Sequence, residues 1–227
     1  MILSFAIFIT FAVFLYSVLQ PAIKTDSDKK FILEYLKTEM VKNISSELIT
    51  TSVVIDEKYK FPPKPCFKIN KAFPGNVIVK DSNKVMKSSS STDDLITVAG
   101  IDTKERFYWV LYSSEFFVPD LVSCSNPKAL IPEDMYKIGF VTKKNYVFAK
   151  KAGEFIEEYN LDYNSQKERL GVLGGIEYGF GFKGESGNLI ETNFRNVTTD
   201  IYIEEIPTEY IDSDGALKFG YVYVKVW

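Results

Sequence analysis

The chain has 227 residues and a formal net charge of −3, with 46% hydrophobic, 25% charged and 15% aromatic residues. This composition is ordinary for a folded protein with a buried core, and the aromatic share favours β structure. The small net charge excludes a basic field for nucleic acid, and the complete absence of histidine excludes Ser-His and Cys-His catalysis and removes the most common metal ligand. We therefore expect no enzymatic activity, no cofactor, no metal site and no nucleic-acid partner.

The first twenty residues, MILSFAIFITFAVFLYSVLQ, carry no charged side chain. A helix needs about 20 apolar residues to cross a bilayer, and the basic start and small-residue cleavage site of a removable signal are not visible. The sequence therefore predicts a transmembrane helix over residues 1–22 that stays on the chain, with Pro21 kinking or ending it. The side chains expected to face lipid or a helical bundle are Ile2, Phe5, Phe8, Phe11, Val13, Phe14, Val18 and Pro21.

An amphipathic helical stalk is predicted next, over residues 23–50. Asp26 or Ser27 can cap its start. Apolar residues then recur at steps of three and four, which is the period of a helix with one apolar face; they are Leu33, Leu36, Met40, Ile44 and Leu48. That face has to cover a surface, most simply the domain that follows.

Residues 51–227 are expected to form a β-rich head, because short apolar or alternating runs are separated by turn residues. One further helix is predicted over residues 149–171, with Gly171 as its stop. The predicted fold class is therefore α+β: a transmembrane helix continuing into a long amphipathic helix, then a mainly antiparallel β head with one further helix. The strands are predicted at 52–56, 76–81, 95–100, 106–113, 137–142, 145–150, 175–183, 188–194, 199–206 and 217–227.

These features together resemble a type IV pilin, and more narrowly the pilin-like surface proteins of archaea. The stretch FIEEYNLDYNSQKERLGVLGGIEYGFGF (155–182) is also similar to a segment of those archaeal proteins. The resemblance implies a structural subunit of a surface filament or of its assembly apparatus, with residues 1–22 packed in a filament core. It also implies membrane lipid, copies of the same chain or other pilin-like subunits as partners, and a location as a membrane-anchored external head or an extracellular filament. Two features depart from the pilin pattern: Phe5 stands where many pilins have a glutamate, and the chain shows no charged leader.

The two cysteines, Cys66 and Cys124, either form one disulfide, as in an oxidising compartment, or lie unpaired in the core. Asn43 and Asn196 begin acceptor triplets for N-glycosylation. These features favour an external head. The lysines at 24, 29 and 30, which follow the first helix, favour a cytoplasmic one instead.

Glycines 179, 181 and 184 have the G-x-G-x-x-G spacing of a dinucleotide-binding loop. Such a loop follows a strand and opens a helix, whereas here the glycines alternate with aromatic residues and a turn and another strand follow. We interpret the stretch as a strand whose glycine face lets a backbone or a large side chain pack closely.

Three other motifs favour ordinary structure over chemistry. DSDG (212–215) begins like a calcium loop but lacks the later ligands, so a hairpin turn is predicted. SSSSTDD (88–94) could supply a serine to a Ser-Lys dyad with Lys84 or Lys87, but it is interpreted as a solvated loop. The adjacent pairs Glu157–Glu158 and Glu204–Glu205 are interpreted as solvated faces rather than as catalytic carboxylates.

A second hypothesis for the function uses the aromatic residues. In it the chain is a stand-alone, single-pass membrane-anchored binding module that recognises a partner or a glycan through an aromatic sheet face. Purified material would distinguish the two hypotheses, because the first predicts an assembly with a helical core and the second predicts single particles.

Overall fold

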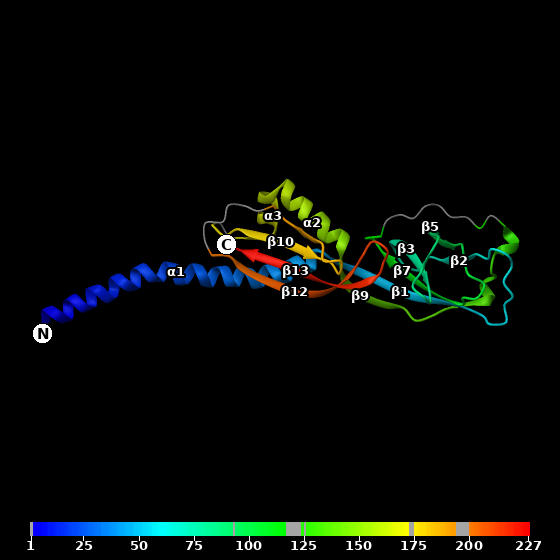
Figure 1. The fold of residues 1–227 in the computed structure, drawn as a ribbon, viewed down its shortest axis with the longest axis horizontal. Coiled ribbons are helices and arrows are strands. Elements are labelled where there is room, and N and C mark those ends of the chain that lie inside the picture. The colour runs from blue at the N-terminus through cyan, green and yellow to red at the C-terminus, as the bar shows by residue number, and fades with distance from the viewer. Residues whose placement is uncertain (1, 93, 117–123, 125, 173–174, 194–199) are drawn as a thin grey trace. The chain divides into compact units, whose positions relative to one another are not determined.

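The structure is a computed structural model of the whole chain (Figure 1). The described residues form thirteen strands, three α-helices and two short 3-10 helices. Backbone is described for residues 2–92, 94–116, 124, 126–172, 175–193 and 200–227, and side chains for all of these except 2–6, 16–26 and 127.

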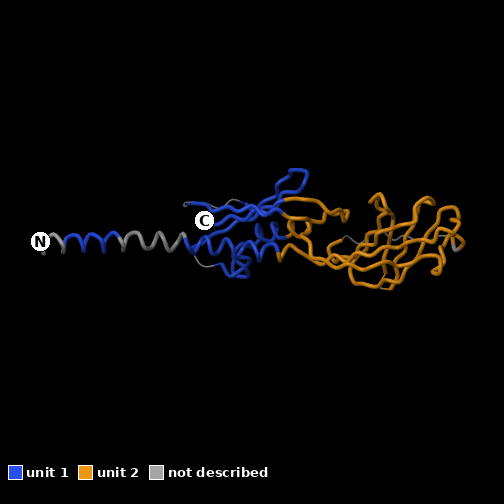
Figure 2. Tube along the Cα trace, turned by 90° about the horizontal axis from the view of Figure 1, so that it is seen from below, with its two compact units in different colours: residues 1–41, 155–207, 221–227 blue, residues 42–154, 208–220 orange. Residues whose placement is uncertain are grey.

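The chain divides into two compact units that are not contiguous in sequence (Figure 2). Unit 1 contains Met1–Val41, Phe155–Pro207 and Tyr221–Trp227, and unit 2 contains Lys42–Glu154 and Thr208–Gly220.

Unit 1 holds most of the long helix α1 (Ile2–Asn43), whose second half is packed against the unit. Ile32, Leu33, Leu36 and Met40 are buried there, as expected for one face of a helix with a period near 3.6 residues. At the border of this face, Lys37 forms an ion pair with Glu204, a residue of strand β12 (Tyr202–Ile211). The second half of α1 is therefore held by an apolar face and by a charged contact at its edge.

The sheet of unit 1 has the strand order β11 (Leu189–Glu191), β10 (Tyr178–Lys183), β13 (Leu217–Val226), β12. Helices α2 (Ala149–Leu161) and α3 (Tyr163–Arg169) contribute aromatic side chains to its core. The rings of Tyr159 and Tyr178 meet edge to face at 5.2 Å, and the Tyr159 hydroxyl donates to the Tyr178 carbonyl at 2.5 Å. A buried tyrosine is favourable here because its ring is packed and its polar end has a partner.

The main sheet of unit 2 is built around β1 (Ser45–Ile55), which pairs antiparallel with three strands. Its order is β9, β1, β7, β3, β4, with β8 on the end of β1, and the last residues of β12 pair in parallel with β9. A second sheet has the order β2, β6, β5. The bounds are β2 Phe67–Asn70, β3 Asn76–Asp81, β4 Met86–Lys87, β5 Ser89–Ser91, β6 Leu95–Val98, β7 Phe107–Ser113, β8 Tyr136–Ile138 and β9 Thr142–Phe148, with 3-10 helices η1 Pro127–Ala129 and η2 Glu133–Met135.

The largest core of unit 2 lies between these two sheets. Alternate residues of β1 and β7, such as Val53 and Val110, point to one face of the main sheet and are fully buried. They meet Phe67 and Ile96 of the second sheet in one apolar cluster. The residues between them point to the opposite face, which carries a smaller cluster that includes Leu111.

Two hairpin turns of unit 2 share one geometry. DSNKV (81–85) links β3 to β4, and DSDGA (212–216) links β12 to β13. In the first turn the Asp81 carboxylate accepts from the N–H groups two and four residues later, at 3.0 and 2.9 Å. In the second turn the Asp212 carboxylate accepts from the equivalent N–H groups at 3.2 and 2.8 Å.

Both turns place their fourth residue in the left-handed region, Lys84 at φ 64° and Gly215 at φ 69°. Glycine adopts this conformation without a steric penalty, whereas a residue with a Cβ does so at a cost. The hairpin predicted for DSDG is confirmed. The stretch SNKVMKSSSSTDD (82–94) was predicted to be one long hairpin tip, whereas the structure has a short turn followed by β4 and β5.

The fold class predicted from the sequence was wrong. The structure is mostly a large mixed sheet, and α1 continues through Pro21 and ends at Asn43 rather than at residue 50. Residues 45–55 are strand β1 because the β-branched residues of this stretch pair on both sides. Two helices, α2 and α3, stand where one was predicted, and the serines predicted to be a loop form β5.

The predicted transmembrane helix was also wrong. Among the residues that the structure describes, no helix contains a stretch both long and apolar enough to cross a membrane. The described part of the chain, which is mainly β-sheet and has no such helix, differs from a pilin-like, helix-anchored protein. The expected location, a membrane-anchored external head or an extracellular filament, depended on that anchor and is corrected with it.

The strained turn residue leads to a first prediction. Lys84→Gly should raise the free energy of unfolding by about 0.5–1 kcal/mol, because it removes a side chain from a left-handed position. Urea denaturation followed by circular dichroism measures the change.

The matched substitution is Gly215→Ala, which adds a Cβ to the equivalent position of the other turn. It should lower the free energy of unfolding by about 1–2 kcal/mol. If Lys84→Gly were as destabilising as Gly215→Ala, the shared geometry of the two turns would be refuted.

Candidate functional site

Residues 7–15 of α1 expose an uncharged apolar surface, which we call the apolar segment. Its large side chains are between 41% and 65% exposed: Ile7, Phe8, Ile9, Phe11, Val13, Phe14 and Leu15. Of the residues singled out from the sequence, Phe8, Phe11, Val13 and Phe14 therefore lie on this surface. The side chains of Ile2, Phe5, Val18 and Pro21 lie outside the described residues.

The apolar segment is exposed around the whole helix. Residues 7, 8 and 9 are consecutive, and each step along a helix turns by about 100°, so their side chains already point in three directions. Thr10, the one hydroxyl in the segment, donates to the Ile7 carbonyl at 3.1 Å, which satisfies it within the helix. A helix that is apolar all round normally lies inside a larger structure.

The glycine motif of β10 belongs to the core of unit 1. A Cβ on Gly179 would lie 3.3 Å from the Trp227 ring, and a Cβ on Gly181 would lie 3.3 Å from the Cβ of Glu191. β10 leads through a turn into β11 and not into a helix. The interpretation that the glycine face admits a large side chain and a neighbouring strand is therefore confirmed.

The hydroxyls and lysines of the possible Ser-Lys dyad are used structurally. Lys87 forms an ion pair with Asp81 at 2.8 Å, so its amine is held by a carboxylate. Ser89 and Ser90 are buried within β5. Lys84 is exposed in the first hairpin turn.

The paired glutamates do not converge on a common point. Glu158 forms an ion pair with Arg169 at 2.9 Å. Glu204 pairs with Lys37, and its neighbour Glu205 accepts from the Tyr223 hydroxyl at 3.1 Å. Neighbouring residues of a strand point to opposite faces, so Glu204 and Glu205 have separate partners.

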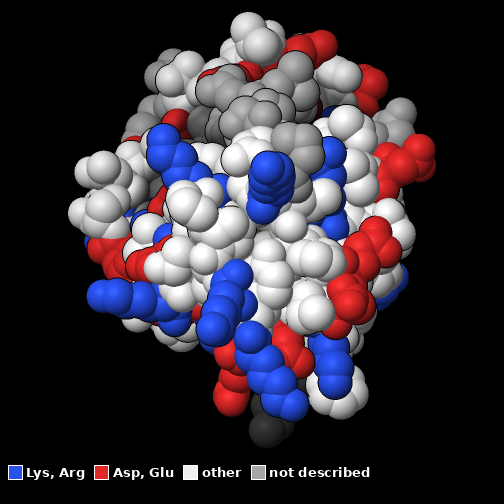
Figure 3. Space-filling model, turned by 90° about the vertical axis from the view of Figure 1, so that its right-hand side faces the viewer, with Lys and Arg blue, Asp and Glu red and all other residues white. Residues whose placement is uncertain are grey.

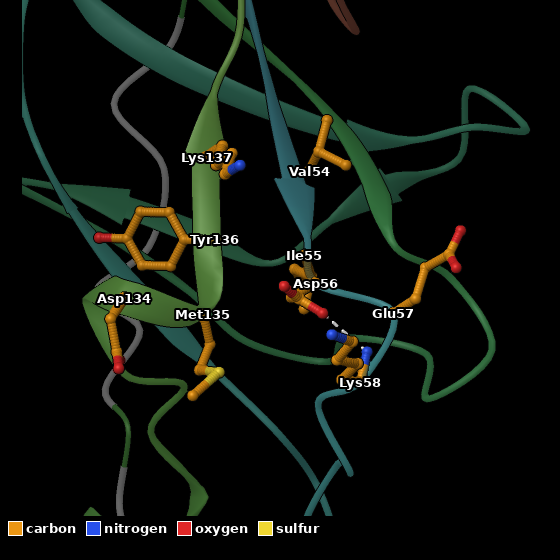
Figure 4. Close-up of a pocket in the computed structure, with 9 residues that line it drawn as sticks. All are labelled: Val54, Ile55, Asp56, Glu57, Lys58, Asp134, Met135, Tyr136 and Lys137. Carbon is orange, nitrogen blue, oxygen red and sulfur yellow. Dashed lines mark hydrogen bonds between the residues drawn. The ribbon is translucent and has the colours of Figure 1, made fainter.

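A cavity of about 350 Å³ lies at the ends of β1 and β8 in unit 2 (Figure 4). The Asp56 carboxylate accepts from the backbone N–H of Lys58 at 2.8 Å. The side chains of Glu57 and Asp134 point away from Asp56 (Figure 4). Across the described residues, no group of three or more Cys, Asp or Glu side chains is arranged to hold a metal ion.

Cys66 and Cys124 are joined by a disulfide, with their Cα atoms 6.0 Å apart. The pairing, which the sequence left open, ties the start of β2 to the segment before η1.

Asn43, one of the two possible glycosylation sites, is exposed at the end of α1. Asn196 lies outside the described residues.

The surface charges are mixed. On the face drawn in Figure 3, basic and acidic side chains are both scattered among uncharged residues. Binding to the phosphates of nucleic acid relies on many basic contacts to one track, and this face does not present one.

Sequence reasoning missed two charged residues of β3 that the structure buries, Lys80 and Asp81. The signal was available, because two charges end the otherwise apolar run NVIVKD (76–81). A charge inside a buried strand calls for a partner or a ligand.

Comparison of the chain with protein-family models, with curated proteins and with solved structures found no match. The interpretation of the protein therefore depends on its own geometry.

The Asp81 carboxylate is the best-defined titrating group of these turns. Burial raises its pKa, but the ion pair with Lys87 and the N–H groups of Val85 and Asn83 outweigh burial and hold the pKa below the ordinary value of 3.8. A carboxylate whose pKa is lowered on folding stabilises the folded state above its unfolded pKa. That contribution is lost as the pH falls below about 3.8 towards the folded pKa.

A second prediction follows for Asp81→Asn. At pH 7 it should lower the free energy of unfolding by about 1–3 kcal/mol, because it leaves Lys87 without its carboxylate. The difference from the unaltered protein should be constant above about pH 5 and shrink below about pH 4. Denaturation measured across this pH range checks it.

Asp134→Asn is the control, since Asp134 is exposed and should show no such difference. An Asp81→Asn effect that persisted unchanged at pH 2 would mean that the carboxylate charge is not what stabilises the turn.

Proposed function

We propose that the protein is a structural, non-catalytic subunit that assembles with other copies of itself through the apolar segment of α1. The observation that carries this proposal is the unbroken exposure of large apolar side chains over residues 7–15. Exposed apolar patches of this kind mark sites of association.

A second copy of the same chain is the partner that fits best. The segment is exposed on all sides, so one flat partner would cover only part of it, whereas a bundle of like helices covers every side. The first twenty residues carry no charge, so identical segments do not repel one another. Burying each Phe, Ile or Val side chain contributes about 1.5–3 kcal/mol before the cost of association is subtracted.

The second half of α1 is used differently from the apolar segment. From Ile32 onward its apolar face is already used inside unit 1, with Leu36 and Met40 fully buried. The subunit therefore has one part of the helix committed to its own fold and another part available to neighbours. No chemical step is required of such a subunit, in keeping with the absence of histidine.

The hypothesis of recognition through an aromatic sheet face has weaker support. The largest fully buried side chains include Tyr108, Tyr112, Tyr178, Phe67 and Phe180. These rings pack cores, so they are not available to a partner. Trp109 of β7 and Phe219 and Tyr221 of β13 are exceptions, at 40%, 67% and 43% exposure.

A third prediction tests the assembly. Val13→Lys should weaken self-association at least tenfold, because packing would bury an unpaired ammonium group. The fold of the subunit should not change, because Val13 is 61% exposed. Sedimentation velocity and light scattering of the purified full chain over a concentration series measure the assembly, and circular dichroism measures the fold.

Phe31→Lys is the matched control. It places the same charge at an exposed position of the same helix, 71% exposed, outside the apolar segment. Self-association should be retained in this variant. Full-length protein that is monomeric at all concentrations, or equal loss in both variants, would overturn the proposal.

A further inference from the structure

A second cavity, of about 400 Å³, opens on the other face of the main sheet of unit 2. Its floor is formed by side chains of β1, β7 and β9, and the turn that links β12 to β13 forms one wall. The first hairpin turn, through Lys84, forms another part of the wall. This volume is within the usual range for a site that takes a small molecule.

Lys80 of β3 is the distinctive group in this cavity. Register places it directly opposite Trp109 of β7, and both side chains belong to the face that carries Leu111. The residue is only 6% exposed. Among the described residues, its amine has no hydrogen bond and no ion pair.

No neighbouring acidic side chain of the described residues forms an ion pair with the Lys80 amine. Lys218 and Asp212 are already paired with each other, and Asp214, which also lines the cavity, is exposed. Burial lowers the pKa of Lys80, with Asp214 and Asp212 acting against it and Lys84 and Lys218 acting with it. An unpaired amine held in this environment gains from an anion that can enter the cavity.

The remaining lining favours an apolar body on that anion. Trp109 is 40% exposed and offers part of its ring to the cavity. Leu48, Leu111 and Tyr146 complete an apolar floor beside the amine. Asp214 at the wall disfavours a second negative charge on the ligand, which argues for a carboxylate over a phosphate dianion.

We propose that this cavity is a binding site for a small amphipathic carboxylate. Its carboxylate pairs with the Lys80 amine, and its flat apolar body lies against Trp109 and Leu111. The site is separate from the apolar segment of α1 and does not depend on assembly.

The test uses the purified full chain and two probes, 2-naphthoate and its uncharged analogue 2-naphthamide, titrated by isothermal calorimetry. The acid should bind saturably and more tightly than the amide. Lys80→Met, which keeps an unbranched side chain of similar shape without its charge, should weaken acid binding by about tenfold to a hundredfold. Binding of the amide should not change.

Three controls make the outcome decisive. Lys104→Met removes an exposed lysine that does not line the cavity and should leave binding unchanged. Asp214→Asn should strengthen acid binding, because it removes a competing carboxylate. Lys80→Met should be at least as stable as the unaltered protein, since it removes a charge that burial disfavours, so a loss of binding does not reflect unfolding.

The proposal is overturned if neither probe binds at millimolar concentration, if acid and amide bind equally, or if Lys80→Met binds the acid as well as the unaltered protein does. It is supported if acid binding is selective, is lost in Lys80→Met and is kept in Lys104→Met.

Discussion

The two-residue alternation of β1 and its neighbours is the constraint on which unit 2 depends. Val53 and Ile55 of β1 face the core shared with the second sheet, while Leu48 and Thr50 face the cavity that holds Lys80. Because side chains alternate strictly along a strand, a shift of one residue in the register would exchange these two faces. β1 pairs with β7, β8 and β9 at once, and these partners oppose such a shift.

The same logic of covered and uncovered faces applies to α1. Its second half has a single apolar face, which unit 1 covers, and a polar side that includes Lys37. The apolar segment has large apolar side chains on all sides, and the described residues leave them exposed. A chain that assembles through this segment would bury in the complex what its own fold does not bury. The apolar segment and the Lys80 cavity therefore suggest two separate roles, one in association and one in ligand binding.

The two hairpin turns connect stability with the proposed site. Each is organised by one aspartate that accepts two backbone N–H groups, and each contributes to the wall of the Lys80 cavity. The second turn lies against the smaller core cluster, since a Cβ on Gly215 would be in van der Waals contact with both Ile78 and Phe116, 3.4 Å away. Such a turn can hold its wall of the cavity in a defined place because neither its conformation nor its packing leaves much freedom.

Several local features were determined by the sequence alone. The predicted strand at 76–81 is β3, the alternation of 106–113 is that of β7, and a left-handed glycine ends the helical region at Gly171. These succeed because turn chemistry and side-chain alternation act over a few residues. The apolar stripe was also partly right: Ile44 and Leu48 are buried as expected, although they lie beyond the end of the helix.

Only the tertiary structure decided where α1 ends, which residues share the Lys80 cavity and that Cys66 meets Cys124. Residues 45–50 fit a helical period and a strand equally well, and pairing with β7 and β9 selects the strand. Lys80 and Asp214 are 134 residues apart in the sequence and line one cavity because β3 and the turn after β12 come together in space. Contacts over such separations depend on how the strands are ordered, and a local pattern carries no information about that order.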